Sequence, residues 1–243
     1  MRRILYLRDA IMSSFRREDR LSKWERKMRS LNLKTAQNLA SYVPREGVFI
    51  DVGANVGAFS DGVINARRDC QCYLFEPIPE YYNYCVKKYK DNKRVIVENY
   101  ALGDACEEAT IYMDKKNLGW NTVVESMTTP GMAKIQINMI KFDDYADKIG
   151  LNNIDLLKID VEGAEYRVLS GMKETLSRLD KKPIIFCEIG WGSKMHPNWH
   201  EECEMFEWLF QNGYRRFDYN AIEATQDVLI IPESRDDRLR NIL

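Results

Sequence analysis

The stretch Val48-Phe49-Ile50-Asp51-Val52-Gly53-Ala54-Asn55-Val56-Gly57 decides the fold. A short apolar run ends beside an aspartate and passes into a turn with two glycines, and helical spacing then begins at Ala58–Arg67. Glycine lets the backbone turn sharply and lets a ligand approach the main chain. The stretch therefore predicts a strand, a tight turn and a helix, with a ligand site at the carboxyl end of the strand.

The same rhythm of apolar runs and helical stretches continues along the chain. Apolar runs without polar alternation are typical of strands covered on both faces, and strands alternating with helices predict a mostly parallel sheet. Further strands are expected at Cys72–Phe75, Val95–Val97, Ile154–Ile159, Ile184–Cys187 and Asp227–Ile231, and helices at Glu80–Asp91, Glu165–Arg178 and Glu201–Gln211. An insertion at about residues 104–142 interrupts this rhythm, with strands expected at Ala109–Met113 and Lys134–Phe142.

Two acidic residues indicate the kind of ligand. The turn has the spacing G-x-x-x-G and not the G-x-G-x-x-G of dinucleotide-binding proteins, and Asp51 suits an amine or hydroxyl better than a phosphate. Glu76 ends the next strand, 25 residues after Asp51, where an acid can hold ribose hydroxyls. A ligand with a ribose, a cationic amino-acid head and no phosphate fits both acids, and S-adenosylmethionine is such a ligand.

Four blocks of sequence resemble the FkbM-type S-adenosylmethionine-dependent methyltransferases. They are Asp51 to Gly57, Glu76-Pro77, Asn99-Tyr100-Ala101-Leu102-Gly103 and Lys158-Ile159-Asp160-Val161-Glu162-Gly163-Ala164-Glu165. The resemblance implies a Rossmann-like class I fold, with a mostly parallel seven-stranded sheet and helices on both faces. It also implies O-methylation, often of sugar hydroxyls in glycans or natural products. The residues expected to bind the cofactor are Asp51, Gly53, Ala54, Asn55, Gly57, Glu76, Pro77, Asn99, Ala101, Leu102 and Asp160.

Acids at neighbouring strand ends are the candidate catalytic residues. Asp160 and Glu188 each end a predicted strand, so they converge on the crevice that would hold the methyl donor. Either acid could remove the proton of an acceptor hydroxyl, and together they could hold Mg²⁺ or another divalent ion. Glu162 and Glu165 follow in the same block, where capping of the next helix is an alternative role.

A loop after Glu188 carries both histidines, His196 and His200. His196 is a candidate base near neutral pH, and an ordinary polar loop residue is the alternative. The aromatic residues Trp120, Trp191 and Trp199, with Asn121, could contact a sugar, although aromatic residues are equally common in cores.

The charges are unevenly distributed. The 243 residues have a net charge of −1, but residues 1–36 contain 11 Lys or Arg and 4 Asp or Glu, so they carry +7 and the remainder carries −8. The overall balance argues against a nucleic-acid partner. We expect residues 1–43 to form a basic helical extension and residues 44–243 the methyltransferase domain. The extension could be a lid or homodimer arm, a contact to an anionic membrane surface, or an arm that holds an RNA or protein substrate.

The cysteines and the hydropathy bear on the cellular location. The six cysteines contain no C-x-x-C pair, and several lie in apolar runs, as reduced thiols packed as small hydrophobic groups do. No apolar stretch is long enough for a secretory signal or a transmembrane segment. The sequence therefore predicts a cytoplasmic enzyme.

Overall fold

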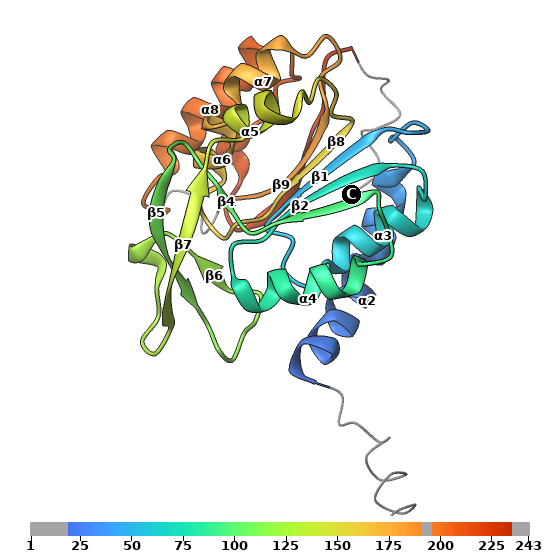
Figure 1. The fold of residues 1–243 in the computed structure, drawn as a ribbon. Helices are drawn as coiled ribbons and strands as arrows, with labels where there is room; N and C mark the ends of the chain where they lie inside the picture. The colour runs from blue at the N-terminus through green and yellow to red at the C-terminus, as the bar shows by residue number, and fades with distance from the viewer. Residues whose placement is uncertain (1–18, 191–195, 235–243) are drawn as a thin grey trace, which may run out of the picture.

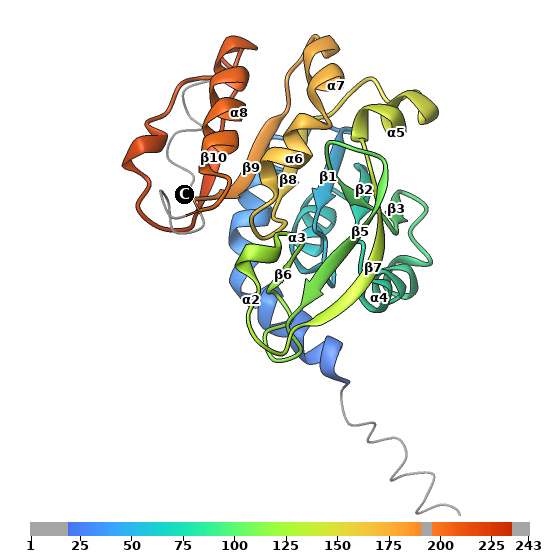
Figure 2. The same cartoon turned by 90° about the vertical axis from the view of Figure 1, so that its left-hand side faces the viewer.

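The computed structural model describes residues 19–190 and 196–234. Its main sheet, seen in Figure 1, has six strands in the order β10-β9-β8-β1-β2-β3, and Figure 2 labels all of them. All neighbouring pairs are parallel except β9 and β10. The strands are β1 (Val48–Val52), β2 (Gln71–Phe75), β3 (Val95–Glu98), β8 (Leu156–Ile159), β9 (Ile184–Ile189) and β10 (Gln226–Ile230). The predicted α/β class and mostly parallel sheet are confirmed.

Helices cover both faces of this sheet (Figure 1). They are α2 (Arg20–Ala40), α3 (Ala58–Ala66) and α4 (Pro79–Tyr89) on one face, and α5 (Phe142–Ile149), α6 (Glu165–Ser170), α7 (Lys173–Arg178) and α8 (Trp199–Gln211) on the other. Successive side chains of a strand point to opposite faces. In β1, Val48, Ile50 and Val52 therefore pack towards α5–α8, and Phe49 packs towards α2–α4.

The resemblance implied seven strands, whereas the main sheet of the described residues has six. The chain between α8 and β10 contains the short helix η3 (Tyr219–Ala221). Its one β-type pairing is an isolated antiparallel bridge between Tyr214 and Pro232, which follows β10. Phe217 and Tyr219 instead stack against the aromatic rings of α8. No ladder for a seventh strand forms there.

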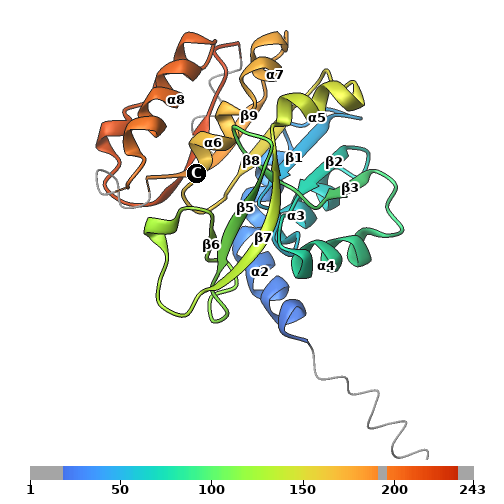
Figure 3. The same ribbon diagram turned by 60° about the vertical axis from the view of Figure 1, so that its left-hand side comes forward.

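The predicted insertion and the short strand just before it form a second sheet, in the order β4-β7-β5-β6; Figure 1 labels β4, and Figures 2 and 3 show β5, β6 and β7. Its elements are β4 (Ala101–Leu102), β5 (Glu107–Met113), β6 (Asn121–Thr122), the short helix η1 (Glu125–Met127) and β7 (Ala133–Ile140). One face of this sheet packs against α2 and α4 through a shared apolar cluster. The insertion therefore lies over the end of α2 that is nearest the glycine turn.

One strand prediction and one helix prediction need correction. Phe142 was expected in a strand, but it begins α5, where Asp143 and Asp144 suit the first turn and Gly150 ends the helix at φ 68°. The predicted helix Glu165–Arg178 is divided into α6 and α7 at Gly171 and Met172. Gly171 lies so close to Gly103 that a Cβ there would be 1.9 Å from the carbonyl oxygen of Gly103. Only glycine therefore fits at this position.

Part of the N-terminal extension is integral to the body. Helix α2 packs on α3 so closely that a Cβ at Gly62 would lie 2.5 Å from the Cβ of Ala36. Ala36, Leu39 and Ala40 are fully buried in the same core cluster as Phe49. Residues 20–40 are thus a layer of the fold, whereas residues 1–18, which carry +3 of the +7 of the first 36 residues, lie outside the described residues.

Four of the six cysteines are buried, namely Cys70, Cys72, Cys85 and Cys187, and all six are free thiols. The interpretation as small packed hydrophobic groups is confirmed for those four. Among the helices of the described ranges, none combines the length and the apolar character that a bilayer crossing requires.

Candidate functional site

The glycine turn after β1 is held in a conformation that its sequence makes possible. Gly53, Asn55 and Gly57 have φ values of 76°, 52° and 69°. A Cβ at Gly53 would lie 2.0 Å from the carbonyl oxygen of Asp160, so only glycine lets the turn approach the end of β8. The backbone N–H groups of Gly53 and Ala54 donate to the carbonyl oxygen of Phe75, at 3.0 and 3.1 Å. The ends of β1, β2 and β8 are thereby joined at one edge of the sheet.

Glu76 links the glycine turn to the turn after β2. Its carboxylate accepts hydrogen bonds from the backbone N–H of Asn55 at 2.7 Å and of Ile78 at 2.8 Å. The residue is 4% exposed, and burial raises the pKa of its carboxyl to about 7, although these two hydrogen bonds oppose the rise. A carboxylate at the end of β2 can accept hydrogen bonds from the hydroxyl groups of a ribose.

Lys158 is a buried cation between two strand-end acids. Its Nζ lies 3.2 Å from Oδ1 of Asp51 and 3.2 Å from Oδ2 of Asp160, and it donates to the carbonyl oxygen of Gly53 at 2.9 Å. Burial alone would lower the pKa of Lys158, but the carboxylates of Asp160 and Asp51 outweigh it and raise the pKa above its usual range. Lys158 therefore stays charged and fixes both acids.

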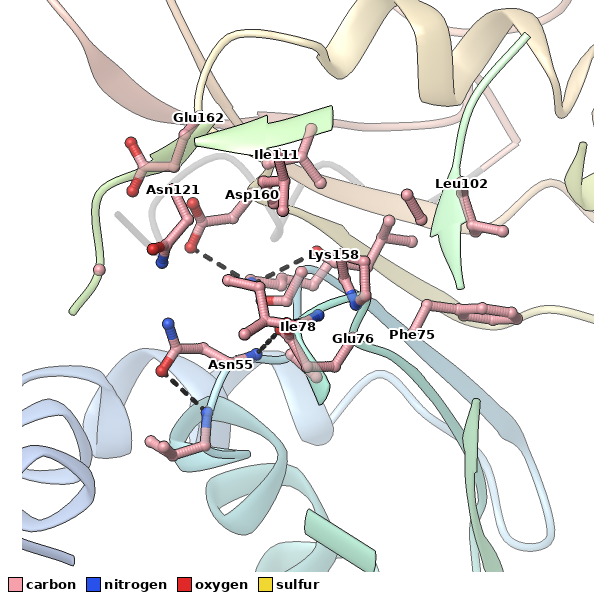
Figure 4. Close-up of a pocket in the computed structure, with 18 of the residues that line it drawn as sticks. Asn55, Phe75, Glu76, Ile78, Leu102, Ile111, Asn121, Lys158, Asp160 and Glu162 are labelled. Carbon is pink, nitrogen blue, oxygen red and sulfur yellow. Dashed lines mark hydrogen bonds and ion pairs between the residues drawn. The ribbon is translucent and has the colours of Figure 1, made fainter. Parts of the chain in front are cut away.

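A cavity lies at this edge, between the glycine turn, the ends of the strands and the second sheet (Figure 4). Asn121, Asp160 and Glu162 gather on the side of the cavity opposite Asn55 (Figure 4). Eight of the residues predicted to bind the cofactor line it: Gly53, Ala54, Asn55, Glu76, Pro77, Ala101, Leu102 and Asp160. The sequence therefore located the cavity and most of its wall.

Three residues predicted to bind the cofactor are not in the cavity wall. Asp51 is fully buried and accepts a hydrogen bond from Ser60 Oγ at 2.5 Å in addition to its pairing with Lys158. Asn99 donates to the carbonyl oxygens of Glu76 and Pro77, both at 2.9 Å. At Gly57, a Cβ would lie 2.6 Å from the hydroxyl oxygen of Tyr89. The contacts of Asp51 and Asn99 hold the cavity wall in shape from behind, and cofactor binding by these three residues stays a prediction.

A cluster of acids adjoins the cavity. One oxygen from each of Asp160, Glu162 and Glu188 lies within 4.8 Å of the others, so the structure brings the two predicted catalytic acids together. Burial and the neighbouring carboxylates raise the pKa of Glu162 to about 10 and that of Glu188 to about 8. Asp227 faces Glu188 across the ladder of β9 and β10, and burial and Asp160 raise its pKa too.

The loop that carries Glu162 is held by Glu165. Glu162 has a φ of 60°, which is unusual for a residue other than glycine. The fully buried carboxylate of Glu165 accepts hydrogen bonds from the backbone N–H of Val161 at 3.0 Å and of Gly163 at 3.0 Å. Burial raises the pKa of Glu165 to about 8, with a further contribution from Glu202 of α8. Glu165 therefore holds the loop that precedes its own helix, a contact different from the helix-capping role expected as the alternative.

The structure does not bring the histidines into the cavity. His196 is 5% exposed, its Nδ1 accepts a hydrogen bond from the backbone N–H of Asn198 at 3.0 Å, and burial lowers its pKa. His196 is absent from the cavity wall and packs against Gly163. His200 is exposed on α8 beside Glu204. This arrangement favours the alternative of a structural loop residue over a base, and it places the ring of His196 against the loop that carries Glu162.

The residues expected to contact a sugar have different outcomes. Asn121 lines the cavity, next to Trp120 in the sequence. Trp199 packs edge-on against Phe206 and Tyr219, so it belongs to the core of α8. Trp191 lies outside the described residues.

Two parts of the site were missed from the sequence. Trp24, Met28 and Asn32 of α2 line the cavity, but their helical spacing did not indicate which surface they would cover. Asp227 reaches the acid cluster because β10 is antiparallel, so its first residues lie at the edge where the other strands end. A strand direction of this kind has no local signal in the sequence.

Comparison with known proteins identifies the family. The family described as the methyltransferase FkbM domain matches residues 51–216. The chain is 26% identical over 194 residues to the 2-O-methyltransferase NoeI of Sinorhizobium fredii (strain NBRC 101917 / NGR234), covering 71% of this chain and 77% of that protein. It is 26% identical over 184 residues to methyltransferase sdnD of Sordaria araneosa, covering 59% of this chain and 67% of that protein.

A crystal structure from Clostridium thermocellum, whose name assigns it provisionally to the rRNA methylases, has the same fold. Its TM-score is 0.50 at 11% identity, and the match covers 83% of this chain and 95% of that one. At this identity the likeness concerns the fold alone. The matched residues begin at Asp51 and contain the glycine turn, Glu76 and the block from Lys158 to Glu165. The chain therefore belongs to the FkbM methyltransferase family and is an S-adenosylmethionine-dependent methyltransferase.

Proposed function

We propose that this methyltransferase acts on a hydroxyl oxygen of a sugar, in a glycan or in a glycosylated small molecule. The observation that carries the proposal is the group of three carboxyl groups, Asp160, Glu162 and Glu188, beside the cavity for the methyl donor. A hydroxyl must lose its proton when its oxygen takes the methyl group, so a nearby base favours an oxygen acceptor. The similarity to a relative named as a 2-O-methyltransferase supports the same choice.

Glu188 is the proposed general base. The hydroxyl oxygen forms a bond to the methyl carbon while the carbon–sulfur bond of the donor breaks, and the hydroxyl proton passes to the Glu188 carboxylate. The products are a methyl ether and S-adenosylhomocysteine. Burial and the Asp160 carboxylate raise the pKa of Glu188 to about 8. A general base is most effective when its pKa lies near the pH of the reaction, here near neutral. The Asp160 carboxylate is already paired with Lys158 at 3.2 Å, and Glu162 remains protonated and can donate a hydrogen bond.

A divalent ion is the second candidate for what these acids do. Carboxylate oxygens are the ligands that Mg²⁺ and Ca²⁺ prefer, and Oε2 of Glu188 is buried without a hydrogen-bond partner. Asp160, Glu162 and Glu188 would then hold the ion. It would lower the pKa of an acceptor hydroxyl bound to it.

The test is methyl transfer from labelled S-adenosylmethionine to a panel of sugars, glycosides, RNA and protein. We expect transfer to sugar hydroxyls, and Glu188→Gln should lower kcat by about 10²-fold or more while leaving donor affinity unchanged. Glu204→Gln, an exposed glutamate of α8 outside the cavity, is the matched control. Transfer only to RNA or protein would reject the proposed acceptor and favour the alternative suggested by the basic N-terminal segment.

The pH profile and a chelator separate the two roles of the acids. With Glu188 as a base, the rate should rise with pH up to about 8 and then level off, because the carboxylate is the active form. Activity that survives a chelator assigns the acids to proton transfer. Activity that a chelator abolishes, and added Mg²⁺ restores, assigns them to a metal ion.

A further inference from the structure

The N-terminal helix α2 contacts the glycine turn directly through Trp24. The indole Nε1–H donates to Oδ1 of Asn55 at 3.1 Å, and the same Oδ1 accepts the backbone N–H of Val56 at 2.9 Å. Nδ2 of Asn55 donates to the carbonyl oxygen of Leu118 in the insertion, at 2.9 Å. The Asn55 side chain is therefore fixed between α2, the turn and the insertion, while its backbone holds a φ of 52°.

A second contact links α2 to the same turn through Lys88. Nζ of Lys88 in α4 lies 3.0 Å from Oε1 of Glu25 in α2 and 2.7 Å from Oδ2 of Asp61 in α3. The same ammonium group donates to the carbonyl oxygens of Val56 at 3.0 Å and of Gly57 at 3.2 Å. The side chains of Lys88 and Glu25 are only 17% and 18% exposed, so solvent screens this pair less than an ordinary surface pair.

Helix α2 also forms part of the cavity wall. Trp24, Met28 and Asn32 line the cavity on the side where Gly119 of the insertion approaches. The indole lies so close to this backbone that a Cβ at Gly119 would be 3.1 Å from Cζ2 of Trp24. These α2 residues lie outside residues 51–216, to which the family match extends. The family match therefore leaves one wall of the cavity unassigned.

We propose that α2 is part of the methyl-donor site and that Trp24 is its positioning residue, which fixes Asn55 and the glycine turn against bound S-adenosylmethionine. The inference deepens the proposed function, since it rests on the use of this donor in this cavity. The positive φ of Asn55 is energetically unfavourable for a residue other than glycine, so neighbouring contacts must hold it. The backbone N–H of Asn55 also donates a hydrogen bond to Oε2 of Glu76 at 2.7 Å. A turn that is already ordered by Trp24 loses less freedom when the donor binds.

The test measures the donor dissociation constant by calorimetry for two substitutions of Trp24. Trp24→Phe keeps an aromatic ring but removes the N–H donor, and loss of one hydrogen bond corresponds to about 2- to 12-fold weaker binding. Trp24→Ala also removes part of the wall and should weaken binding by about 10- to 100-fold. At saturating donor, kcat should stay within about twofold of wild type, so that the effect falls on donor affinity. The matched control is Trp208→Ala, a half-buried tryptophan of α8 outside this cavity.

Two readouts separate positioning from a general loss of stability. Donor binding should change the intrinsic fluorescence of the wild type and of Trp208→Ala, and the change should shrink in Trp24→Phe. Combining Trp24→Phe with Asn55→Ala should weaken binding by less than the product of the two single effects, because both remove the same hydrogen bond.

The outcomes distinguish this inference from the proposed function. A wild-type protein that binds no S-adenosylmethionine would overturn both. A wild-type protein that binds the donor, with Trp24→Phe and Trp24→Ala equal to it in affinity and fluorescence response, would overturn the role of Trp24 alone. If Trp24→Ala fails to fold, Trp24→Phe and the double variant decide the question.

Discussion

Replacement of Glu76 by glutamine should change how the stability of this protein depends on pH. The native carboxyl has a pKa of about 7 against 4.5 for an ordinary glutamate, mainly because it is buried. Between these two values the unfolded chain has released its proton and the native chain has kept it. The native state binds more protons in this window, so the free energy of unfolding contributed by Glu76 falls as the pH rises.

The size of this effect follows from the shift. A shift from 4.5 to about 7 corresponds to about 3 kcal/mol in total at 1.36 kcal/mol per unit. About 2 kcal/mol of this lies between pH 5 and pH 7.5. Glutamine carries no ionisable proton, so the contribution disappears in Glu76→Gln. The stability difference between wild type and variant should therefore shift by about 2 kcal/mol, in favour of the variant, from pH 5 to pH 7.5.

Urea unfolding of wild type and Glu76→Gln at the two pH values measures this difference. The subtraction cancels the similar contributions of Glu165 and Glu188, whose raised pKa values act in the same direction. Glu108→Gln, at an exposed position of β5, is the control and should show the same stability difference at both pH values. A difference for Glu76→Gln that does not change with pH would refute the assignment of a buried carboxyl with a raised pKa.

Donor affinity provides an independent check on Glu76. If ribose hydroxyls donate to the carboxylate, protonation weakens binding, and the dissociation constant should rise toward tenfold per pH unit below about 7. Glu76→Gln should bind the donor more weakly than wild type at pH 7.5 and lack this pH dependence. Equal affinity in the two proteins at both pH values would remove Glu76 from the donor site.

Two further predictions concern the buried charges and the helix packing. Lys158→Met should destabilise the protein by about 3–5 kcal/mol, because it leaves the fully buried Asp51 without its cation; an unchanged urea midpoint would contradict this. Gly62→Val should push α2 away from α3, since even a Cβ at this position would lie 2.5 Å from that of Ala36. The substitution should lower the free energy of unfolding by about 1–3 kcal/mol. Calorimetry should find weaker donor binding in Gly62→Val as Trp24 moves; wild-type affinity would argue against coupling of α2 to the donor site.

Local patterns in the sequence predicted most of the main sheet and the edge that carries the site. Each apolar run is followed by a turn and a helix, and parallel strands joined in this way end at one edge. Glu76, Asp160 and Glu188 could therefore be brought together from their places at predicted strand ends, and the structure confirms that they share this edge. Helix α5 and the break at Gly171 were missed. Helix α5 is short and depends on its capping residues, and the close approach of Gly103 to Gly171 joins segments that are far apart in the sequence.

The direction of a side chain at a strand end was less predictable than its position. Asp51 and Glu76 both lie where strands end, but Asp51 turns to Ser60 and Lys158, and Glu76 lines the cavity. A side chain in a strand points to one of two faces, and which face borders the ligand depends on how the neighbouring strands and helices are placed. The same holds for His196, whose loop position is compatible with the cavity although its ring packs beneath the Glu162 loop.

The sequence by itself determined the glycine turn, the strand-end acids and the family, because these depend on residues that are close together along the chain. Tertiary structure alone decided that α2 lines the cavity with Trp24, and that Asp227 joins the acids through an antiparallel strand. An amphipathic helix or an apolar strand specifies a face to be buried without specifying its partner. The partner is chosen by packing between segments far apart in the sequence, as between Ala36 and Gly62.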